Sequence, residues 1–499
     1  MPDFAPKPLF STSQIRRIEQ RAIDESGVAA YELMQRAGLA AWRLLLQRWP
    51  QAQTIGIVCG PGNNGGDGYV LARLAADSGR QVRVVRLSGD SPRAEPARQA
   101  YDAWCANPCP SWVFGLDDEL PQVDVWVDAL FGLGLRREPD RVAADLIAAI
   151  DASRRPVLAL DLPSGVDADS GHAIGAAVRA DITLTFIASK LGLHTGAGRS
   201  HAGEVSVDAL DLPAALIACE PPSAHLYGSH CLGGWLSPRP RNSHKGHFGH
   251  VLCVGGEHGY AGAIALCAES ALRCGAGLVS VATRAEHVAP LLARRPECMV
   301  RAVADAGDLQ PMIERSSVIA IGPGLGQADW AQALLHAAVA SGELLVIDAD
   351  ALNLLARDSQ HLRDAIVTPH PGEAARLLGS TVAELERDRY AAAQALAQRL
   401  RCVVVLKGAG TIIAAPERAP AVIDAGNPGM AVGGMGDVLT GAIAALRAQG
   451  WQEYDAAVCG ALLHSSAADA AAREGGERGL LPTDLMPWLR RLANPESVS

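Results

Sequence analysis

The sequence contains no run of about 18 consecutive apolar residues, the length that a membrane-spanning helix requires. Residues 1–30 carry Arg, Glu and Asp and lack the apolar segment of a secretory signal peptide. We therefore expect neither a membrane-spanning segment nor a signal peptide in this chain.

Basic residues are in deficit, because 44 Lys and Arg face 54 Asp and Glu and the formal net charge is −10. This balance argues against nucleic acid or an anionic membrane surface as a general partner. Lysine is especially rare and occurs only as Lys7, Lys190, Lys245 and Lys407. Each lysine is therefore a candidate for a specific role.

Cysteine pairs of the C-x-x-C type are absent among the 11 cysteines. Cys105 and Cys109 lie closest together, and no histidine cluster stands beside them to complete a zinc site. Scattered cysteines in a large α/β chain are typical of a reducing compartment, so a cytoplasmic location is expected.

Apolar residues are plentiful: hydrophobic side chains make up 49% of the 499 residues and charged side chains 20%. This composition is globular and excludes disorder for most of the chain. Because a single hydrophobic core stops growing beyond about 250–300 residues, the length favours two large domains.

Short apolar strands alternate with helices in the first part of the chain. The segment 11–49 predicts two amphipathic helices, and further helices are expected at about 69–78 and 142–152. Strands separated by helices indicate parallel βαβ units, so we expect a doubly wound sheet. The expected strands are 54–59, 82–87, 123–127, 157–160 and 182–186.

A second α/β series begins at residue 250, after proline and glycine interrupt the pattern between residues 212 and 242. We interpret this interruption as a linker. The sequence therefore predicts an α/β protein of two domains, 1–220 and 221–499. The expected strands of the second series are 250–254, 279–282, 318–321, 344–347 and 402–406.

The first expected strand is followed by the loop Gly60-Pro-Gly-Asn-Asn-Gly-Gly-Asp-Gly68. Ligands of parallel α/β sheets bind at the carboxyl ends of the strands, and a helix N-terminus favours phosphate. The glycines alone would also suit a tight turn, whereas Asn63, Asn64 and Asp67 add directional polar groups and a charge. We therefore interpret this segment as a binding loop.

Two further strand ends hold carboxylates. Asp128 ends an apolar strand, and Asp161 begins the segment Asp161-Leu-Pro-Ser-Gly-Val-Asp167. A helix cap or a loop hydrogen bond would also explain Asp128. Together with Ser164 and an asparagine, these side chains offer oxygen ligands for a monovalent or divalent cation and leave one carboxylate for acid–base chemistry.

In the second series, Lys407 stands at a strand end beside two glycines and the hydroxyl of Thr411, a combination that suits nucleotide phosphate. The segment Asn427-Pro-Gly-Met-Ala-Val-Gly-Gly-Met-Gly-Asp437 leads into an apolar helix. Consecutive glycine N–H groups that open a helix form an anion-binding nest. Asp437, at the positive helix end, is placed to remain ionised and serve as a base.

Three shorter motifs, 255–263, 322–326 and 368–373, also follow expected strands. Each glycine loop by itself is more often a tight turn, and a lone histidine such as His370 is usually structural. These motifs become informative only in combination with the others.

In combination, the motifs make the chain recognisable. The loop 60–69, the Asp128 segment and Asp161-Leu-Pro-Ser-Gly resemble the N-terminal YjeF family of NAD(P)H-hydrate epimerases. The Lys407 segment and Asn427–Asp437 resemble the ADP-dependent NAD(P)H-hydrate dehydratases, whose fold is ribokinase-like. The two regions cover nearly the whole chain, in the order of the bacterial bifunctional nicotinamide nucleotide repair proteins.

The resemblance implies a Rossmann-like N-terminal domain that interconverts the R and S epimers of NAD(P)H hydrated at C6. It also implies a ribokinase-like C-terminal domain that dehydrates the S epimer while ADP is hydrolysed to AMP and phosphate. Potassium is implied for the epimerase, and magnesium and ADP for the dehydratase, although the sequence shows no clear magnesium ligand set. The implied partners are hydrated NADH or NADPH, ADP and other copies of the chain in a homo-oligomer.

Site residues are implied by the same resemblance. Catalytic roles are implied for Asp161 and Asp437, and potassium binding is implied for Asn64, Asp128 and Ser164. Substrate contacts are implied for Asn63, Asn64, Gly65, Gly66, Asp67, Gly132, Leu133, Gly134, Leu135, Arg136, Arg137, Glu138, Asp161, Ala261, Gly324, His370 and Asp437. Adenosine-phosphate contacts are implied for Lys407, Gly408, Ala409, Gly410, Thr411 and Gly436.

Two positions depart from the family pattern, because Leu133 and Val432 each replace a common threonine. The first departure affects a hydrogen bond to phosphate or ribose, and the second lies in the anion-binding loop. Neither removes a proposed charge, so both activities remain expected.

Two other interpretations stay open. A small-molecule kinase of the ribokinase type would also end a glycine loop with an Asp base, but it would leave the N-terminal half unexplained. Alternatively, the first domain is a non-catalytic binding or scaffold module. The polar set of Asn63, Asn64, Asp67, Asp128 and Asp161 argues against that second alternative.

Overall fold

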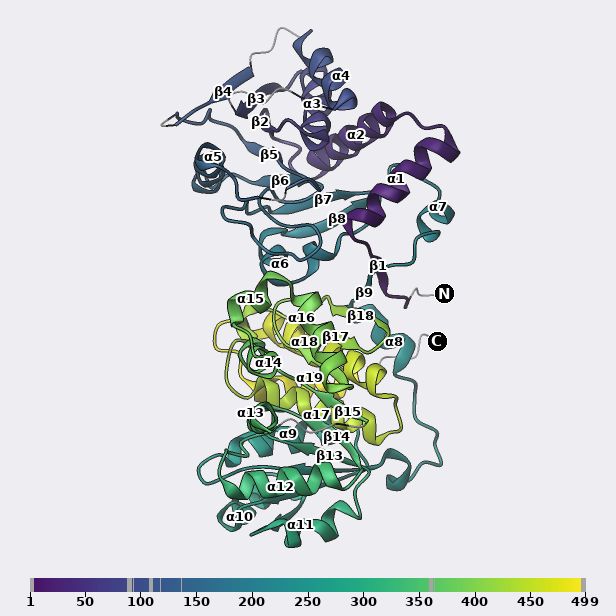
Figure 1. Cartoon of the computed structure of the whole chain (residues 1–499), viewed down its shortest axis with the longest axis vertical. Helices are drawn as coiled ribbons and strands as arrows, with labels where there is room; N and C mark the ends of the chain where they lie inside the picture. Colours follow the sequence, from purple (N-terminus) through teal and green to yellow (C-terminus); the bar gives the residue numbers. More distant parts are fainter. Residues whose placement is uncertain are drawn as a thin grey trace. The chain divides into compact units, whose positions relative to one another are not determined.

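The computed structural model describes residues 4–87, 92, 94–106, 111–116, 118–135, 137–358, 362 and 364–494. Two compact units divide the chain: one comprises Pro8–Ala224, and the other comprises His225–Ser499 together with the N-terminal residues through Lys7. Each unit is built around its own β-sheet (Figure 1).

A seven-stranded parallel sheet forms the centre of the N-terminal unit in the described residues, with the order β4-β3-β2-β5-β6-β7-β8. The expected doubly wound sheet is thereby confirmed, and β4 and β8 extend it beyond the expected strands. The strands are β2 (Thr54–Cys59), β3 (Gln81–Leu87), β4 (Ser111–Phe114), β5 (Val125–Ala129), β6 (Val157–Leu160), β7 (Ile182–Phe186) and β8 (Glu204–Asp208).

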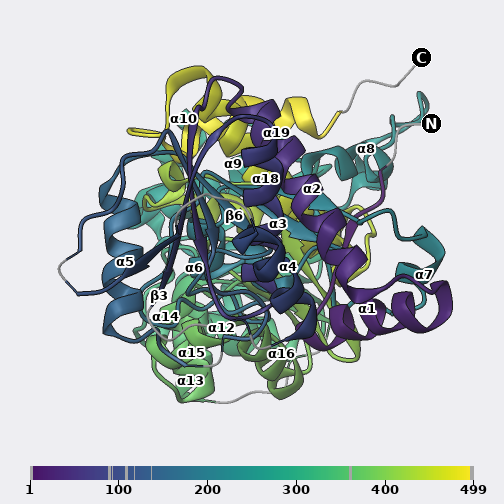
Figure 2. The same ribbon diagram turned by 90° about the horizontal axis from the view of Figure 1, so that it is seen from above.

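Helices cover both faces of this sheet, as Figure 2 shows for α5 on one side and α1 to α4 on the other. Ile57 packs against the face that α1 to α4 cover, and Val58 packs against α5, because successive residues of a strand point to opposite faces. The helices are α1 (Thr12–Ser26), α2 (Ala30–Arg48), α3 (Asn63–Asp77), α4 (Glu95–Cys105), α5 (Arg141–Ala152), α6 (Gly196–His201) and α7 (Ala214–Ala218).

Helix α3 begins at Asn63, earlier than the start near Tyr69 that the sequence predicts. Gly62 is its N-cap, so the polar loop residues form the first turns of the helix. A Cβ on Gly65 would lie 1.9 Å from the carbonyl oxygen of Gly60, so only glycine permits this close approach. The expectation that residues 63–68 form a turn before the helix was wrong, because this tertiary contact outweighs the low helix propensity of glycine.

An eleven-stranded sheet, counted over the described residues, organises the C-terminal unit in the order β1-β9-β18-β17-β16-β15-β14-β13-β10-β11-β12. The strands from β10 to β16 pair in parallel, whereas β17 pairs antiparallel with both β16 and β18. The strands are β1 (Lys7–Leu9), β9 (Ala224–Tyr227), β10 (His250–Val254), β11 (Leu278–Thr283), β12 (Met299–Ala302), β13 (Val318–Ile321), β14 (Leu344–Ile347), β15 (Ala365–Val367), β16 (Val403–Leu406), β17 (Ile412–Ala415) and β18 (Arg418–Ile423).

One hydrophobic core of this unit lies between the sheet and the helices α9, α17, α18 and α19, and α9 packs closely against α17. A Cβ on Gly441 of α17 would lie 2.1 Å from the carbonyl oxygen of Cys267 in α9, so glycine permits the approach. Among the described residues, no helix combines the length and the apolar composition needed to cross a membrane. The helices are α8 (Leu232–Trp235), α9 (Ala261–Arg273), α10 (Val288–Arg294), α11 (Ala306–Ile313), α12 (Asp329–Ala340), α13 (Ala349–Arg357), α14 (Pro371–Leu378), α15 (Val382–Arg387), α16 (Arg389–Leu400), α17 (Met435–Ala448), α18 (Glu453–Gly475) and α19 (Leu485–Leu492).

The stretch 212–242, which the sequence predicts as a linker, contains regular structure. It forms α7, β9 and α8, and β9 pairs in parallel with β18 at the edge of the larger sheet. Pro213 precedes α7 and Gly228 follows β9, whereas Gly233 and Gly234 lie within α8. The boundary between the compact units falls inside this stretch, between Ala224 and His225.

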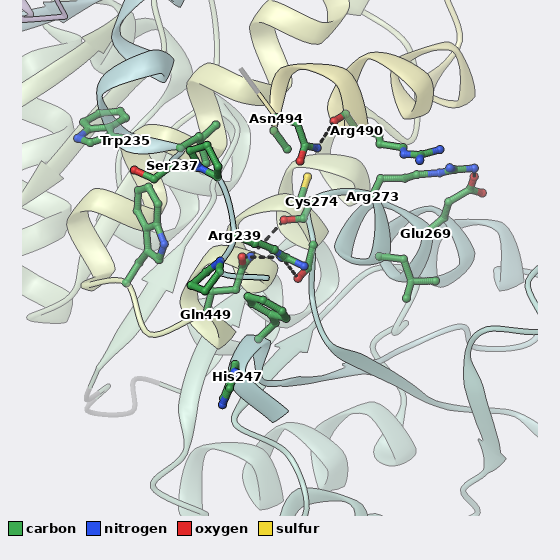
Figure 3. A pocket seen from close by; sticks show the side chains of 18 of the residues that line it. Trp235, Ser237, Arg239, His247, Glu269, Arg273, Cys274, Gln449, Arg490 and Asn494 are labelled. Atoms are coloured by element: carbon green, nitrogen blue, oxygen red, sulfur yellow. Dashed lines mark hydrogen bonds and ion pairs between the residues drawn. The ribbon is translucent and has the colours of Figure 1, made fainter. Parts of the chain in front are cut away.

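A cavity of about 600 Å³ lies where α9 and α17 end in the C-terminal unit (Figure 3). Arg239 donates hydrogen bonds to the carbonyl oxygen of Gly275 and to the side chain of Gln449, each just beyond a helix end. Buried Glu269 pairs with Arg295 in the same wall. These polar groups bind helix ends and one another, which is a structural role.

Candidate active sites

A cavity of about 590 Å³ lies at the carboxyl edge of the N-terminal sheet. The loops after β2, β5, β6 and β7 line it together with residues of α1 and α2. The predicted binding residues that line it are Asn63, Asn64, Asp67, Gly132, Leu133, Gly134, Leu135, Arg137, Glu138 and Asp161. Gly65 and Gly66 are instead buried within α3, and Arg136 lies outside the described residues.

The three predicted cation ligands gather beside this cavity. The Oδ1 of buried Asp128 accepts a hydrogen bond from the Ser164 hydroxyl at 2.6 Å, and its Oδ2 accepts one from the Ser164 backbone N–H at 2.7 Å. The Asn64 side-chain amide donates to the carbonyl oxygen of Phe131 at 3.0 Å. The Asn64 Oδ1 atom is buried without a hydrogen-bond partner.

This cluster of oxygen atoms fits a bound cation. An unpartnered buried amide oxygen such as Asn64 Oδ1 is costly. Burial raises the pKa of Asp128 to about 6, and hydrogen bonds from Ser164 and Leu130 only partly oppose the rise. A cation held between these atoms would satisfy the amide oxygen and favour the ionised carboxylate, and oxygen ligands suit hard cations.

Asp161 follows β6 with a left-handed backbone, at a φ of 65°. Its Oδ1 accepts hydrogen bonds from the Phe186 N–H at 3.2 Å, from the Thr185 hydroxyl at 3.3 Å and from the Lys190 ammonium group. Lys190 also donates to Thr185 Oγ1 and to the Phe186 carbonyl oxygen, both at 2.7 Å. From the sequence, Lys190 stood out only as one of four scarce lysines.

Two further carboxyl groups, Glu19 of α1 and Asp67 of α3, line the same cavity. Burial raises the pKa of both groups, and the nearby charge of Asp161 raises them further, that of Asp67 well above its usual range. Both are therefore biased toward the protonated form, so the cavity offers proton donors beside Asp161. Glu19 belongs to no motif, so nothing in the sequence singled it out.

The predicted binding residues of the C-terminal unit meet at one edge of its sheet. Ala261 begins α9 after β10, Gly324 follows β13, His370 follows β15 and Lys407 follows β16. These strands belong to the parallel series, so their carboxyl ends lie at the same edge. Asp437 reaches this edge in the first turn of α17.

An ion pair lies at the centre of this edge. Lys407 Nζ is 2.8 Å from Oδ1 of buried Asp348, and the Thr440 hydroxyl of α17 donates to Oδ2 of Asp348 at 2.9 Å. A Cβ on Gly436 would lie 3.2 Å from Lys407 Nζ, so glycine lets the start of α17 approach the pair. The sequence prediction omitted Asp348, although it follows β14 as Asp161 follows β6, and that position was the available signal.

Two carboxyl groups beside this pair titrate near neutrality. Burial and the charge of Asp348 raise the pKa of Asp437 to about 7, while Lys407 partly opposes the rise. The expectation that Asp437 remains ionised was therefore wrong, because burial outweighs the positive helix end and the carboxyl group is only partly ionised at pH 7. Burial likewise raises the pKa of Glu373 to about 7, with its Oε2 atom 3.8 Å from Lys407 Nζ. Groups with such pKa values exchange protons readily at physiological pH.

His370 caps the N-terminus of α14. Its Nδ1 accepts a hydrogen bond from the Gly372 N–H at 3.0 Å, and its backbone N–H donates to Glu373 Oε2 at 2.8 Å. Burial and the charge of Lys407 lower the pKa of His370, so its ring is neutral at pH 7. The histidine therefore has a local structural role and stands beside the Lys407 pair.

The predicted nucleotide segment 408–411 turns sharply after β16. Gly408 and Gly410 adopt positive φ angles of 144° and 63°, which glycine accepts without strain. The Thr411 hydroxyl donates to the Gly408 carbonyl oxygen at 3.1 Å. Ala409 lies between the two glycines, so the whole segment is a preformed turn next to Lys407.

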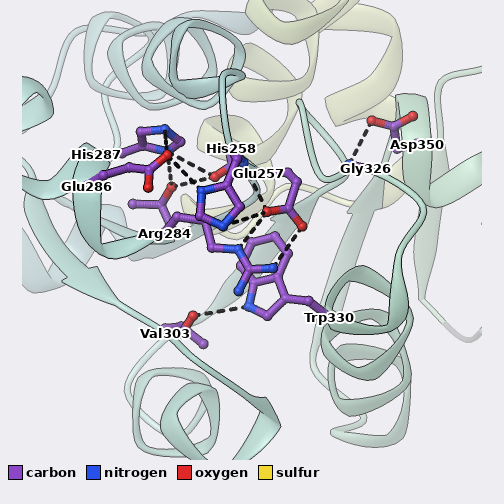
Figure 4. Close-up of polar contacts among 11 residues, drawn as sticks. Glu257, His258, Arg284, Glu286, His287, Val303, Gly326, Trp330 and Asp350 are labelled. Carbon is purple, nitrogen blue, oxygen red and sulfur yellow. Dashed lines mark hydrogen bonds and ion pairs between the residues drawn. The ribbon is translucent and has the colours of Figure 1, made fainter.

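The loop that leads into α9 is held by a network of charged groups (Figure 4). Arg284 donates to both carboxylate oxygens of Glu257, at 2.7 and 2.9 Å, and its guanidinium lies 4.0 Å from the ring centroid of Trp330. The Glu257 N–H donates to the Gly324 carbonyl oxygen at 2.6 Å. Glu257 and Arg284 therefore fix the two loops that hold Ala261 and Gly324.

The two departures from the family pattern lie at these sites. Leu133 lines the N-terminal cavity, and its carbonyl oxygen accepts a hydrogen bond from Arg16 at 3.3 Å. Val432 is exposed just before α17. Neither position holds a charged group, and the charged residues around each site are present.

Two family profiles match this chain. The profile described as YjeF-related protein N-terminus matches residues 30–192, and the profile described as NAD(P)H-hydrate dehydratase matches residues 251–491. The first match falls within the N-terminal unit and the second within the C-terminal unit. The two profiles therefore correspond to the two sites described above.

Relatives with both regions align along nearly the whole chain. The bifunctional NAD(P)H-hydrate repair enzyme Nnr of Coxiella burnetii is 48% identical over 98% of this chain and 99% of its own length. The enzyme of the same name from Escherichia coli is 45% identical over 98% of this chain and 95% of its own length. A ribokinase-like superfamily protein from Enterococcus faecalis V583, known from a crystal structure, is 32% identical with a TM-score of 0.51, over 55% of this chain and 97% of that chain. This structure supports a ribokinase-like C-terminal fold, and the full-length alignments show that the chain belongs to the family of bifunctional NAD(P)H-hydrate repair enzymes.

Proposed function

We propose that the N-terminal unit interconverts the R and S epimers of hydrated NAD(P)H, and that the C-terminal unit dehydrates the S epimer with consumption of ADP. One observation supports the proposal above all. A chain that aligns over 98% of its length with bifunctional repair enzymes holds two separate polar sites, one at the carboxyl edge of each sheet.

The N-terminal reaction inverts the ring carbon that bears the hydroxyl group. The C6–O bond breaks with its electron pair, a proton from Asp67 or Glu19 converts the departing oxygen to water, and the ring nitrogen stabilises the cation. Water then adds to the opposite face and gives a proton to Asp161, from which it returns to the acid. The same cavity is lined by the proposed acids, Asp67 and Glu19, and by the proposed base, Asp161, so both proton transfers can occur there.

Asn64, Asp128 and Ser164 would hold the potassium ion of the epimerase. The unpartnered Asn64 Oδ1 and the raised pKa of Asp128 support this assignment. A bound cation would give the amide oxygen a partner and would lower the pKa of the carboxyl group. When bound, the ion supplies positive charge beside the loops after β2, β5 and β6. These residues would then keep the Asp161 loop and the Asn63 loop in fixed positions.

In the C-terminal unit, Asp437 accepts the proton of the C6 hydroxyl group, and the freed oxygen forms a bond to the terminal phosphorus of ADP. The bond between that phosphorus and AMP breaks. The C6–O bond then breaks, phosphate leaves, and loss of a proton from C5 restores the ring double bond. The glycine N–H groups before α17 and the turn after Lys407 would bind the phosphates, and the positive φ angles of Gly408, Gly410 and Gly434 support this role.

Magnesium with ADP is the expected partner of this site. Among the described residues, no group of three histidine, cysteine, aspartate or glutamate side chains is arranged to hold a metal ion. Asp348 and Glu373 instead face the ammonium group of Lys407, at 2.8 and 3.8 Å. The described residues therefore do not form a magnesium site by themselves. When bound, magnesium supplies charge neutralisation for the phosphates.

Incubation of the purified chain with the separated epimers tests the proposed function. With ADP, the S epimer should disappear as NAD(P)H, AMP and phosphate form in equal amounts. The R epimer should follow the same course only after epimerisation. A kinase would instead leave a stable phosphorylated product, and absence of NAD(P)H formation would refute the dehydratase assignment.

We further propose that the two activities separate between residues 1–220 and 221–499, close to the boundary of the compact units. The cysteines that the structure describes are all free thiols, which supports a reducing, cytoplasmic location. Assembly into a homo-oligomer stays a prediction.

A further inference from the structure

Lys190 has no part in the chemistry above, yet its side chain is completely buried. A buried ammonium group is costly unless its hydrogens are bound and its charge is paired. Its three acceptors are Asp161 Oδ1, Thr185 Oγ1 and the Phe186 carbonyl oxygen. These match the three hydrogens of the ammonium group, so none remains for a substrate.

Asp161 is held asymmetrically by this arrangement. Its Oδ1 accepts hydrogen bonds from Lys190, Thr185 and Phe186, whereas no described residue donates a hydrogen bond to its Oδ2. Asp161 also lines the cavity. One oxygen is therefore fixed, and the other remains available to a bound substrate.

The backbone at Asp161 needs such support. A non-glycine residue with a φ of 65° is strained and persists only where the surrounding structure holds it. Lys190 bridges the side chain of Asp161 to Thr185 and Phe186 at the end of β7. The bridge ties the strained loop to the sheet.

The charge of Lys190 acts on the other carboxyl groups of the cavity as well. Lys190 lowers the pKa of both Glu19 and Asp67, against the larger effects that raise them. Arg16 of α1 adds positive charge near Glu19. Loss of Lys190 would therefore remove the buried ammonium group that stabilises the ionised forms of Glu19, Asp67 and Asp161.

We propose that Lys190 is a positioning residue of the epimerase reaction, which holds Asp161 by one oxygen so that the other accepts the proton of the attacking water. The inference rests on the proposed epimerase function of the N-terminal unit. It assigns Lys190 no proton transfer of its own. The test must therefore separate positioning from a purely structural contribution.

Lys190→Met in the full chain provides the main test, with conversion of the R to the S epimer as the assay. Because a positioned base is worth about 10²–10⁴-fold, we expect kcat to fall by about 10²-fold while KM changes little. Removal of the cation disfavours ionised carboxylates, so the acidic limb of the pH–rate profile should move to higher pH. ADP-dependent dehydration of the S epimer should be unchanged in the same chain.

Thr185→Val is a milder variant that keeps the shape of β7 and removes the hydroxyl shared by Lys190 and Asp161. We expect epimerisation to fall about tenfold, the effect of one hydrogen bond to a charged group. Thr183→Val is the matched control, because Thr183 is also buried on β7 but donates to the carbonyl oxygen of Ala202. It should leave epimerisation unchanged.

The results for these variants separate the positioning role of Lys190 from the proposed function. An unaltered kcat and pH profile in Lys190→Met, or equal losses in Thr185→Val and Thr183→Val, would overturn the positioning role alone. If Lys190→Met does not fold, the comparison of the two threonine variants settles the question. If the wild-type chain fails to epimerise, the proposed function falls together with this inference.

Discussion

Replacement of Asp437 by Asn tests proton transfer in the dehydratase most directly. Asn keeps the size of the side chain in the first turn of α17 but cannot accept the proton. Since a positioned general base contributes about 10²–10⁴-fold, ADP-dependent dehydration should fall by that factor. Nucleotide binding should change little, because Lys407 and its glycine turn are unaltered.

The pKa of about 7 at Asp437 also sets a pH dependence. The carboxylate must be ionised to act as a base, and each pH unit below the pKa lowers the ionised fraction about tenfold. Wild-type dehydration should therefore rise with pH and level off above about pH 7. The residual activity of Asp437→Asn should lack this rise.

The same shift predicts a cost in stability. Because the pKa of Asp437 is higher in the folded chain than its ordinary value of 3.8, the folded state binds the proton more tightly. This stabilisation is complete below pH 3.8 and is lost as the pH rises through about 7. At about 1.36 kcal/mol per pKa unit, the difference amounts to at most about 4 kcal/mol.

Asp437→Asn should therefore raise the free energy of unfolding of the C-terminal unit at pH 8 relative to the wild type, and much less at pH 4. Denaturant unfolding at the two pH values measures this difference. Hydrate disappearance and AMP formation should be followed together, with epimerisation by the same chain as the control. Near-normal turnover in the variant would refute the proton-transfer role, and a persistent acidic limb would assign it to Glu373 instead.

Three further predictions concern the cation cluster, the charged loop and the two units. Asp128→Ala should weaken epimerisation and its dependence on potassium while S-form dehydration stays intact, and equal loss of both activities would indicate misfolding. Glu257→Gln should raise the KM for the hydrate about tenfold, as loss of a charged pair that fixes a binding loop. Glu286→Gln is the control: Glu286 is exposed and contacts His258, so its substitution should leave the KM unchanged. Equal increases in the KM of the two variants would contradict the role of Glu257. Separate polypeptides cut near residue 225 should each be soluble and keep one activity, whereas aggregation of both would argue against two independent cores.

The sequence by itself determined the parallel α/β architecture. Short apolar runs bounded by glycine loops correctly located β2, β6, β7, β10, β13 and β14, because a buried parallel strand must be apolar along its whole length. The glycine loops and strand-end carboxylates, taken together, also pointed to the family that the alignments show. These features depend on local sequence, so they are visible without coordinates.

Only the tertiary structure decided which polar groups meet. Lys190 pairs with Asp161 and Lys407 with Asp348, although each pair is separated along the chain and the sequence places no motif around Lys190 or Asp348. Helix α3 begins inside the glycine loop because its backbone packs closely against Gly60, which outweighs local propensity. Partners that are distant in sequence leave no local pattern, and the burial that makes such pairs chemically important exists only in the folded chain.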